Sequence, residues 1–381
     1  MNSAKLMTWM VAAGVATGFA LSGVAAASPM PTPPATPVET PPAAPSVAAP
    51  AASAATPPAA AAATPPTPAA AIPPSPRAGT GELSPASLNA PGLTTVVTRR
   101  SKGAATLRAQ ILLDRARFSP GEIDASYGSN MRRAVAGFQA SNGIQASGNV
   151  DAATWAALDR DSAPVLVAYT LTEADVAGPF VPIPADMMEK SKMPALGYTS
   201  VLEMLGEKFH ASPKLLQQLN PGQDFAKSGQ QINVPSVEPA TPMPAIAKLV
   251  IDKSEFTVSL LDASDKVVAQ YPASTGSEHD PLPIGVWKIQ GVSSNPTFNY
   301  NPALFWDANP KHSKAKIPAG PNNPVGVVWV DLSKEHYGIH GTPEPSKIGK
   351  TESHGCIRMT NWSALAMSAA VKPGMSAVLQ E

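Results

Sequence analysis

Hydrophobic residues recur at helical spacing between residues 106 and 160. Met131, Val135 and Phe138 fall on one face of a predicted helix, three and four residues apart. Asp151 precedes an Ala-Ala-Thr-Trp run, and its carboxylate suits an N-cap because it can accept from the free backbone N–H groups of a first helical turn. The pattern predicts a small three-helix bundle over residues 106–160.

The pattern changes to strand-like alternation after residue 247. Phe256, Val258 and Leu260 are expected on one face of a strand, and the polar turn 262–265 leads to a hairpin partner. Further strand-like runs occupy 285–290, 325–330 and 377–380, and one helix is expected over 361–371. Short strands with one or two helices indicate a β-rich sandwich or barrel over residues 247–381.

A largely apolar run, Leu6 to Val24, follows Lys5 and precedes three alanines that end at Ala27. A basic start, an apolar stretch and an Ala-x-Ala site are typical of a secretory signal, so we predict a signal peptide over residues 1–27 and export of the protein. An uncleaved membrane anchor is the alternative, since the run is near the lower length limit for spanning a bilayer. No cysteine stands directly after the run, which excludes a bacterial lipoprotein.

Residues 28–92 consist almost entirely of Ala, Pro, Thr and Ser. This stretch has neither helical nor alternating periodicity and almost no aromatic surface, so it cannot bury enough area to fold. Proline favours the extended polyproline II conformation. We therefore predict a disordered, semi-rigid linker.

Charge and cysteine content narrow the candidate chemistry. The chain has 28 basic and 28 acidic residues, so its balance gives no basis for attraction to nucleic acid or to an anionic membrane surface. Membrane contact is expected only if the signal is uncleaved. Cys356 is the one cysteine among 381 residues and cannot form an intramolecular disulfide. In an exported protein such a thiol is a candidate reactive group.

A histidine that ends a strand-like stretch, His340, precedes Cys356 by 16 residues. The loop between them contains prolines and a glycine and can turn the imidazole back toward the thiol. A Cys⁻/His⁺ pair would lower the thiol pKa from its usual value of about 8.5. Gly355 allows an unusual backbone angle, and the backbone N–H groups of His354, Gly355 and Cys356 are candidates for an oxyanion hole.

The residues alone leave two other interpretations of this thiol open. A lone cysteine is often a buried filler of the core. Zinc is the second alternative, although the paired ligand spacing typical of zinc sites is absent. Its candidate ligands would be His336, His340, His354 and Cys356.

Two segments of the helical region, AVAGFQASNGI and GNVDAATWAAL, resemble the PGB-1 type of bacterial peptidoglycan-binding domain. That family combines an FQ pair with a TW pair at this separation. The resemblance implies a peptidoglycan-binding domain over residues 106–160. We assign the two aromatic residues of these pairs, Phe138 and Trp155, to core packing.

The segment from 167 to 237 is similar to a LysM module at its end. LLQQLNP, residues 215–221, and GQQINVP, residues 229–235, match the family's second helix and closing strand. The opening segment, residues 169–171, is separated from the helices by a long insertion, which departs from the family. The resemblance implies a LysM-like α+β module and leaves its glycan binding open.

The sequence IHGT-x9-ESHGCIRM resembles the signature of the L,D-transpeptidase family, also called the YkuD domain. The resemblance implies that Cys356 is the nucleophile, that His340 is its general base and that the Gly341 carbonyl orients the imidazole. It also implies that Ser353 and His354 shape the pocket and the nucleophile loop. No metal or organic cofactor is implied.

Arg358 has two possible roles that the sequence does not separate. Its planar, fixed charge suits a substrate carboxylate. A hydrogen bond to the backbone of its own loop is the alternative.

The implied reaction is peptidoglycan L,D-transpeptidation. A donor tetrapeptide stem would form a thioester with the cysteine and release D-Ala. An amine would then take the acyl group: a second stem would give a 3→3 crosslink, or a protein lysine would give an anchored wall protein. A non-catalytic wall-binding protein and an amide hydrolase with the same thiol are the alternatives.

The chain is thus predicted to be multidomain, exported, and located in the periplasm or cell wall. A YkuD-type catalytic domain of β-rich sandwich or barrel form would follow the three-helix bundle and the LysM-like module. Peptidoglycan, both stem peptides and glycan, is the expected partner.

Overall fold

The computed structural model describes residues 83–90 and 92–381. The predicted signal peptide and residues 28–82 of the predicted linker lie outside the described residues. The described end of that linker is not disordered as predicted: Pro85–Leu88 form a helix, because Ser84 caps it and Leu88 is buried in the core. Within the described ranges, no helix is long and apolar enough to cross a membrane.

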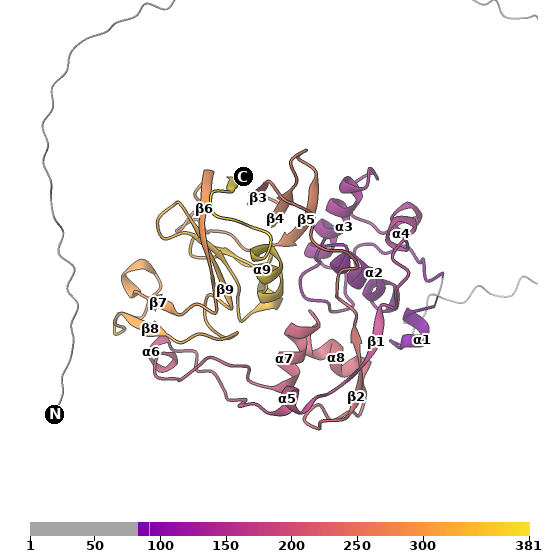
Figure 1. The fold of residues 1–381 in the computed structure, drawn as a ribbon, viewed down its shortest axis with the longest axis horizontal. Coiled ribbons are helices and arrows are strands. Elements are labelled where there is room, and N and C mark those ends of the chain that lie inside the picture. The colour runs from indigo at the N-terminus through magenta and orange to yellow at the C-terminus, as the bar shows by residue number, and fades with distance from the viewer. Residues whose placement is uncertain (1–82, 91) are drawn as a thin grey trace, which may run out of the picture. The chain divides into compact units, whose positions relative to one another are not determined.

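The helical region begins with a short helix and continues with the three that the spacing predicts (Figure 1). Asp151 caps the last of them by accepting from the Thr154 N–H at 2.9 Å, which confirms the N-cap prediction. Phe138 and Trp155 are 6% and 1% exposed, so their assignment to the core is also confirmed. The four helices are α1 (Pro85–Leu88), α2 (Ala104–Arg115), α3 (Ser129–Ser141) and α4 (Ala152–Leu158).

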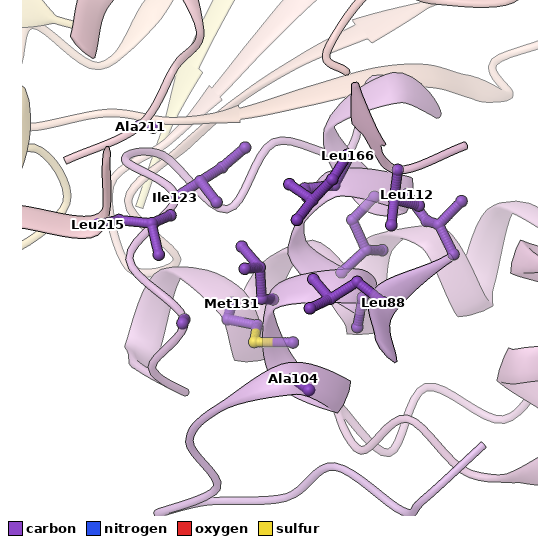
Figure 2. Close-up of a cluster of buried hydrophobic side chains, with 14 of the residues drawn as sticks. Leu88, Ala104, Leu112, Ile123, Met131, Leu166, Ala211 and Leu215 are labelled. Carbon is purple, nitrogen blue, oxygen red and sulfur yellow. The ribbon is translucent and has the colours of Figure 1, made fainter. Parts of the chain in front are cut away.

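A two-stranded antiparallel sheet follows, with four short helices between its strands in the chain. Its core is continuous with that of the helical region, because Leu166 and Leu215 join the same cluster as Leu88 and Met131 (Figure 2). The elements are β1 (Leu166–Thr170), α5 (Glu173–Val176), α6 (Met187–Lys190), α7 (Val201–Lys208), α8 (Pro213–Leu219) and β2 (Gln231–Pro235).

The C-terminal part is an eight-stranded sheet of order β11-β10-β9-β6-β12-β3-β4-β5. Strand pairing is antiparallel except for β10 with β11 and β12 with β3, which are parallel. Helix α9 (Asn361–Ser368) follows the edge strand β11 in the chain and ends at Ser368, before the predicted residue 371. The strands are β3 (Lys248–Asp252), β4 (Thr257–Leu261), β5 (Val267–Pro272), β6 (Gly285–Ser294), β9 (Val328–Leu332), β10 (Gly338–His340), β11 (Ile357–Arg358) and β12 (Ser376–Gln380).

The strand alternation predicted for the first hairpin is wrong at its first residue, Phe256. Phe256 has a φ of +52° and lies outside β4, with its N–H bonded to the Lys253 carbonyl at 3.3 Å. Because this turn precedes the strand, the strand begins at Thr257. The Thr257 side chain is buried, although the predicted alternation put it on the face opposite the apolar residues. Likewise, residues 325–327 form a turn, and the predicted strand there begins at Val328.

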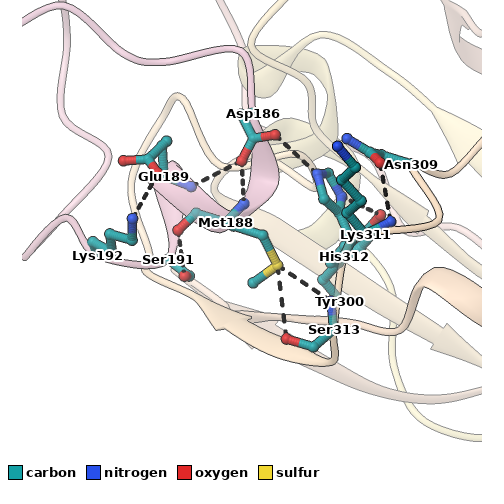
Figure 3. A network of polar contacts seen from close by, with 10 residues as sticks. All are labelled: Asp186, Met188, Glu189, Ser191, Lys192, Tyr300, Asn309, Lys311, His312 and Ser313. Atoms are coloured by element: carbon teal, nitrogen blue, oxygen red, sulfur yellow. Dashed lines mark hydrogen bonds and ion pairs between the residues drawn. The ribbon is translucent and has the colours of Figure 1, made fainter.

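A separate hairpin, β7 (Phe298–Tyr300) with β8 (Ala315–Ile317), packs against the insertion that carries α6. Figure 3 shows the polar contacts between them. His312 donates from Nε2 to Asp186 Oδ2 at 2.8 Å, and its Nδ1 lies 3.0 Å from the Tyr300 hydroxyl. The long insertion therefore supports the hairpin.

Candidate active site

Parallel pairing at the sheet edge brings the two predicted catalytic segments together. Ile339 is opposite Ile357, and His340 is opposite Arg358. His340 and Arg358 therefore lie on the same face of the sheet, and Cys356 stands in the bend directly before β11.

The imidazole of His340 is held from two sides. Its Nδ1 lies 2.7 Å from the Gly341 carbonyl oxygen, and a carbonyl only accepts, so Nδ1 carries the proton. The other nitrogen, Nε2, is left with its lone pair. The ring stacks on Trp329, with centroids 5.5 Å apart and an interplanar angle of 14°.

Burial sets the charge of this imidazole. Desolvation lowers the pKa of His340 to about 4, and the positive charge of Arg358 acts in the same direction, against the hydrogen bond to Gly341. The ring is therefore neutral at physiological pH.

The Cys356 thiol also stays uncharged. Desolvation raises its pKa to about 11, although the backbone of Gly338 and the charge of Arg358 oppose the rise. Among the described residues, Sγ donates to the His336 carbonyl oxygen at 3.6 Å rather than bonding to His340. The expected lowering of the thiol pKa by a Cys⁻/His⁺ pair is thus wrong for this state, because burial outweighs the nearby charges.

The nucleophile loop has the geometry of a tight turn. Gly355 has a φ of +95°, and a Cβ there would lie 3.0 Å from the Tyr337 ring, so glycine is required on both counts. Ser353 closes the turn, because its hydroxyl donates to the Cys356 carbonyl at 2.5 Å. In the part of the chain that the structure describes, the N–H groups of Gly355 and Cys356 have no acceptor.

His354 faces the β7–β8 hairpin instead of the thiol. Its Nε2 lies 3.0 Å from Asp307 Oδ1, and its ring meets the edge of Phe305 at a centroid distance of 5.3 Å. The hairpin thus contacts the nucleophile loop through this side chain.

Arg358 makes the backbone contact that was one of its two possible roles. Its Nη2 donates to the carbonyl of Glu352 and lies 3.5 Å from Thr351 Oγ1. Its Nε is buried and has no partner among the described atoms.

The histidines and the cysteine of the zinc alternative do not converge. His336 pairs through Nε2 with its neighbour Glu335 at 3.5 Å, and His354 turns to Asp307. Residues 83–90 and 92–381 contain no group of three or more His, Cys, Asp or Glu side chains that could hold a metal ion.

Two residues of the site were missed by reasoning from the sequence. Trp329 is brought to His340 by strand pairing, and Gly338 leaves room for its ring, since a Cβ there would lie 2.4 Å from it. Asn361 accepts the Thr342 N–H at 3.1 Å and so holds the turn after His340. Asn361 immediately follows the nucleophile motif, whereas Trp329 has no signal in the sequence.

Comparisons with known proteins identify two segments of the chain. A model of the L,D-transpeptidase catalytic domain matches residues 247–379, and a model of a putative peptidoglycan-binding domain matches residues 102–158. The chain is 30% identical over 175 residues to the putative L,D-transpeptidase YkuD of Bacillus licheniformis. The aligned region covers 45% of this chain and 89% of that protein. The corresponding protein of Bacillus subtilis is 30% identical over 174 residues, with the same coverage of 45% and 89%.

A solved L,D-transpeptidase structure from Xylanimonas cellulosilytica is 16% identical and covers 74% of this chain and 96% of its own, with a TM-score of 0.32. At that TM-score the likeness adds nothing to the sequence matches. The two matched domains define a peptidoglycan-acting acyltransferase. The chain belongs to the L,D-transpeptidase family, and a cell-wall or periplasmic location follows from the two matched domains.

Proposed function

We propose that Cys356 and His340 carry out L,D-transpeptidation of peptidoglycan stem peptides as nucleophile and general base. The main support is the parallel β10–β11 pairing, which brings the strand that ends at His340 beside the strand that directly follows Cys356, with the imidazole Nε2 unprotonated. Because both groups are neutral, the proton moves from Sγ to Nε2 as the sulfur attacks, rather than beforehand.

The first half-reaction acylates the enzyme. Sγ attacks the carbonyl carbon of the diaminopimelate–D-Ala bond, and the oxyanion faces the N–H groups of Gly355 and Cys356. The carbon–nitrogen bond then breaks, the departing D-Ala amine takes the proton from His340, and a thioester remains.

The second half-reaction regenerates the thiol. An acceptor amine attacks the thioester and gives its proton to the imidazole, and the sulfur leaves as thiol. The acceptor is the side-chain amine of a second stem, which gives a 3→3 crosslink, or a lysine of a wall-anchored protein.

The upstream parts serve this reaction by holding the enzyme on its substrate. In this layout, residues 1–27 direct export, the Ala/Pro-rich stretch that begins at residue 28 and ends before helix α1 acts as a spacer, and residues 106–160 bind peptidoglycan, which raises the local substrate concentration. Residues 167–237 form a LysM-like module, a proposal supported by the antiparallel β1–β2 pair with α7 and α8 between its strands. The catalytic domain extends over 247–381.

Intact-protein mass spectrometry with a muropeptide tetrapeptide tests the mechanism. Wild type is expected to gain the mass of the acyl group with loss of D-Ala, Cys356→Ala to gain none, and His340→Ala to react at least about a hundredfold more slowly. Turnover by Cys356→Ala would rule the mechanism out. Addition of an acceptor stem separates the alternatives: crosslinked product supports transfer, free tripeptide indicates a hydrolase, and binding to sacculi without any muropeptide change indicates a non-catalytic protein.

A further inference from the structure

A carboxylate from the segment upstream of the catalytic domain reaches the start of helix α9. Glu207, on α7, accepts a hydrogen bond from Asn361 Nδ2 at 2.7 Å. Asn361 is 1% exposed, so this contact is made away from water. A second contact lies alongside, because His210 stacks on Trp362 with ring centroids 5.1 Å apart and an interplanar angle of 9°.

The other end of the same amide holds the turn that follows His340. Asn361 Oδ1 accepts from the N–H groups of Thr342 at 3.1 Å and Val327 at 3.3 Å. A Cβ added to Gly341 would lie 2.1 Å from this oxygen, so the amide packs directly against the Gly341 backbone. The carbonyl of Gly341 in turn accepts from His340 Nδ1.

The direction of the amide depends on Glu207. The NH₂ group of Asn361 faces two acceptors, Glu207 Oε1 and the Pro321 carbonyl at 3.2 Å. An amide has donors at one end and an acceptor at the other, so these partners fix its oxygen toward the turn. Without the carboxylate, one buried donor loses its partner and the constraint on the amide weakens.

We propose that Glu207 is a positioning residue for the catalytic base, acting through Asn361 and the Gly341–Thr342 turn. The segment that carries α7 is then part of what sets the orientation of His340, in addition to any role in binding the wall. The inference rests on the proposed role of His340 as the general base.

The chain offers a matched control one helical turn earlier. Glu203 lies on the same face of α7 and accepts from Asn322 Nδ2 at 2.7 Å. Its contact also joins α7 to the catalytic domain, but it does not involve the turn after His340. Glu203→Ala therefore loosens the interface without releasing the amide of Asn361.

Single-turnover acylation of the full chain, followed by intact mass over a range of tetrapeptide concentrations, tests the proposal. Glu207→Ala is expected to lower the maximal acylation rate on the order of tenfold with an unchanged half-saturating concentration, because the base is displaced while the donor site is intact. Glu207→Gln, which keeps an acceptor for Asn361, and Glu203→Ala are expected to react at the wild-type rate.

A double-mutant cycle tests whether the effect passes through Asn361. Adding Glu207→Ala to Asn361→Ala is expected to cause no further loss of rate. Additive losses, a wild-type rate in Glu207→Ala, or an equal loss in Glu203→Ala would each overturn the proposal. If Glu207→Ala unfolds at the assay temperature, Glu207→Met, which fills the site without an acceptor, is measured under the same expectations. Failure of the wild type to acylate would instead contradict the proposed function.

Discussion

At the residue scale, the candidate site holds a neutral thiol and a neutral imidazole. The Gly341 carbonyl fixes the proton on Nδ1 of His340, and the stacked Trp329 ring excludes water from its face. Both pKa shifts have the same main cause, which is desolvation of the charged form. Proton transfer during attack, rather than a preformed thiolate, is the chemistry that these shifts favour.

The raised thiol pKa predicts slow alkylation of Cys356 at neutral pH. Iodoacetamide reacts with the thiolate, so its rate is expected to rise with pH toward about 11. Glutathione is the control. An alkylation midpoint below that of glutathione would show that a thiolate–imidazolium pair exists in the resting enzyme.

Acylation by the peptide donor is expected to follow the imidazole instead. The rate should be independent of pH around neutrality and should fall as the pH drops through about 4, where His340 becomes protonated. Single-turnover rates between pH 3.5 and 8 measure this. A midpoint near 6.5, the ordinary histidine value, would contradict the burial argument.

At the element scale, the pairing of β9 with β10 creates the surroundings of the base. Trp329 is opposite His340 in the register, and Gly338, two residues earlier, provides the space that the indole ring occupies. This arrangement needs a glycine for steric reasons, not for its backbone angle.

Gly338→Ala is accordingly expected to displace the Trp329 ring and lower the acylation rate by about tenfold. Gly291→Ala in β6 is the matched control, because an added Cβ there has nothing within 4 Å. The two variants are compared by single-turnover acylation and by the tryptophan near-UV circular dichroism. Equal rates for both would mean that the stacked ring does not orient the imidazole.

At the scale of the whole molecule, contacts from the upstream segments converge on the catalytic loops. Asn130 of α3 donates to the Ile348 carbonyl at 2.8 Å, within the loop that joins His340 to Cys356. Glu207 of α7 accepts a hydrogen bond from Asn361, which lies five residues after Cys356, the C-terminal end of that loop. The described segments upstream of residue 247 are therefore in contact with the active-site region rather than only tethered to it.

Glu207 also makes stability depend on pH. Desolvation raises its pKa from 4.5 to about 7, with Glu203 adding to the rise while Asn361 and Tyr198 oppose it. The folded protein holds a proton that the unfolded chain releases between these two values, so this contribution to stability is complete below 4.5 and is lost as the pH rises through 7. Glu207→Gln removes the dependence.

The expected result is a higher melting temperature for Glu207→Gln than for wild type at pH 8 and similar values at pH 5. The shift corresponds to at most about 3 kcal/mol of unfolding free energy. Thermal unfolding followed by circular dichroism at both pH values measures it. A difference between the two proteins that is the same at pH 5 and pH 8 would contradict the raised pKa.

Local patterns in the sequence predicted most of the element types and singled out His340 and Cys356 as the candidate pair. Helical spacing and the Asp151 cap are properties of neighbouring residues, and the His340 and Cys356 motifs are short enough to be recognised without a fold. Phe256 was misassigned because a left-handed turn residue looks like any other apolar residue of an alternating run.

The remaining features depend on which distant segments pack together. Trp329, Asn361 and Glu207 are placed by strand register and by the packing of α7 on α9, and neither can be deduced from one chain's local pattern. The charge states follow the same division: the sequence by itself determined that the chain carries a thiol and an imidazole in one motif. Only the tertiary structure decided that both are neutral groups, because desolvation is set by everything that surrounds them.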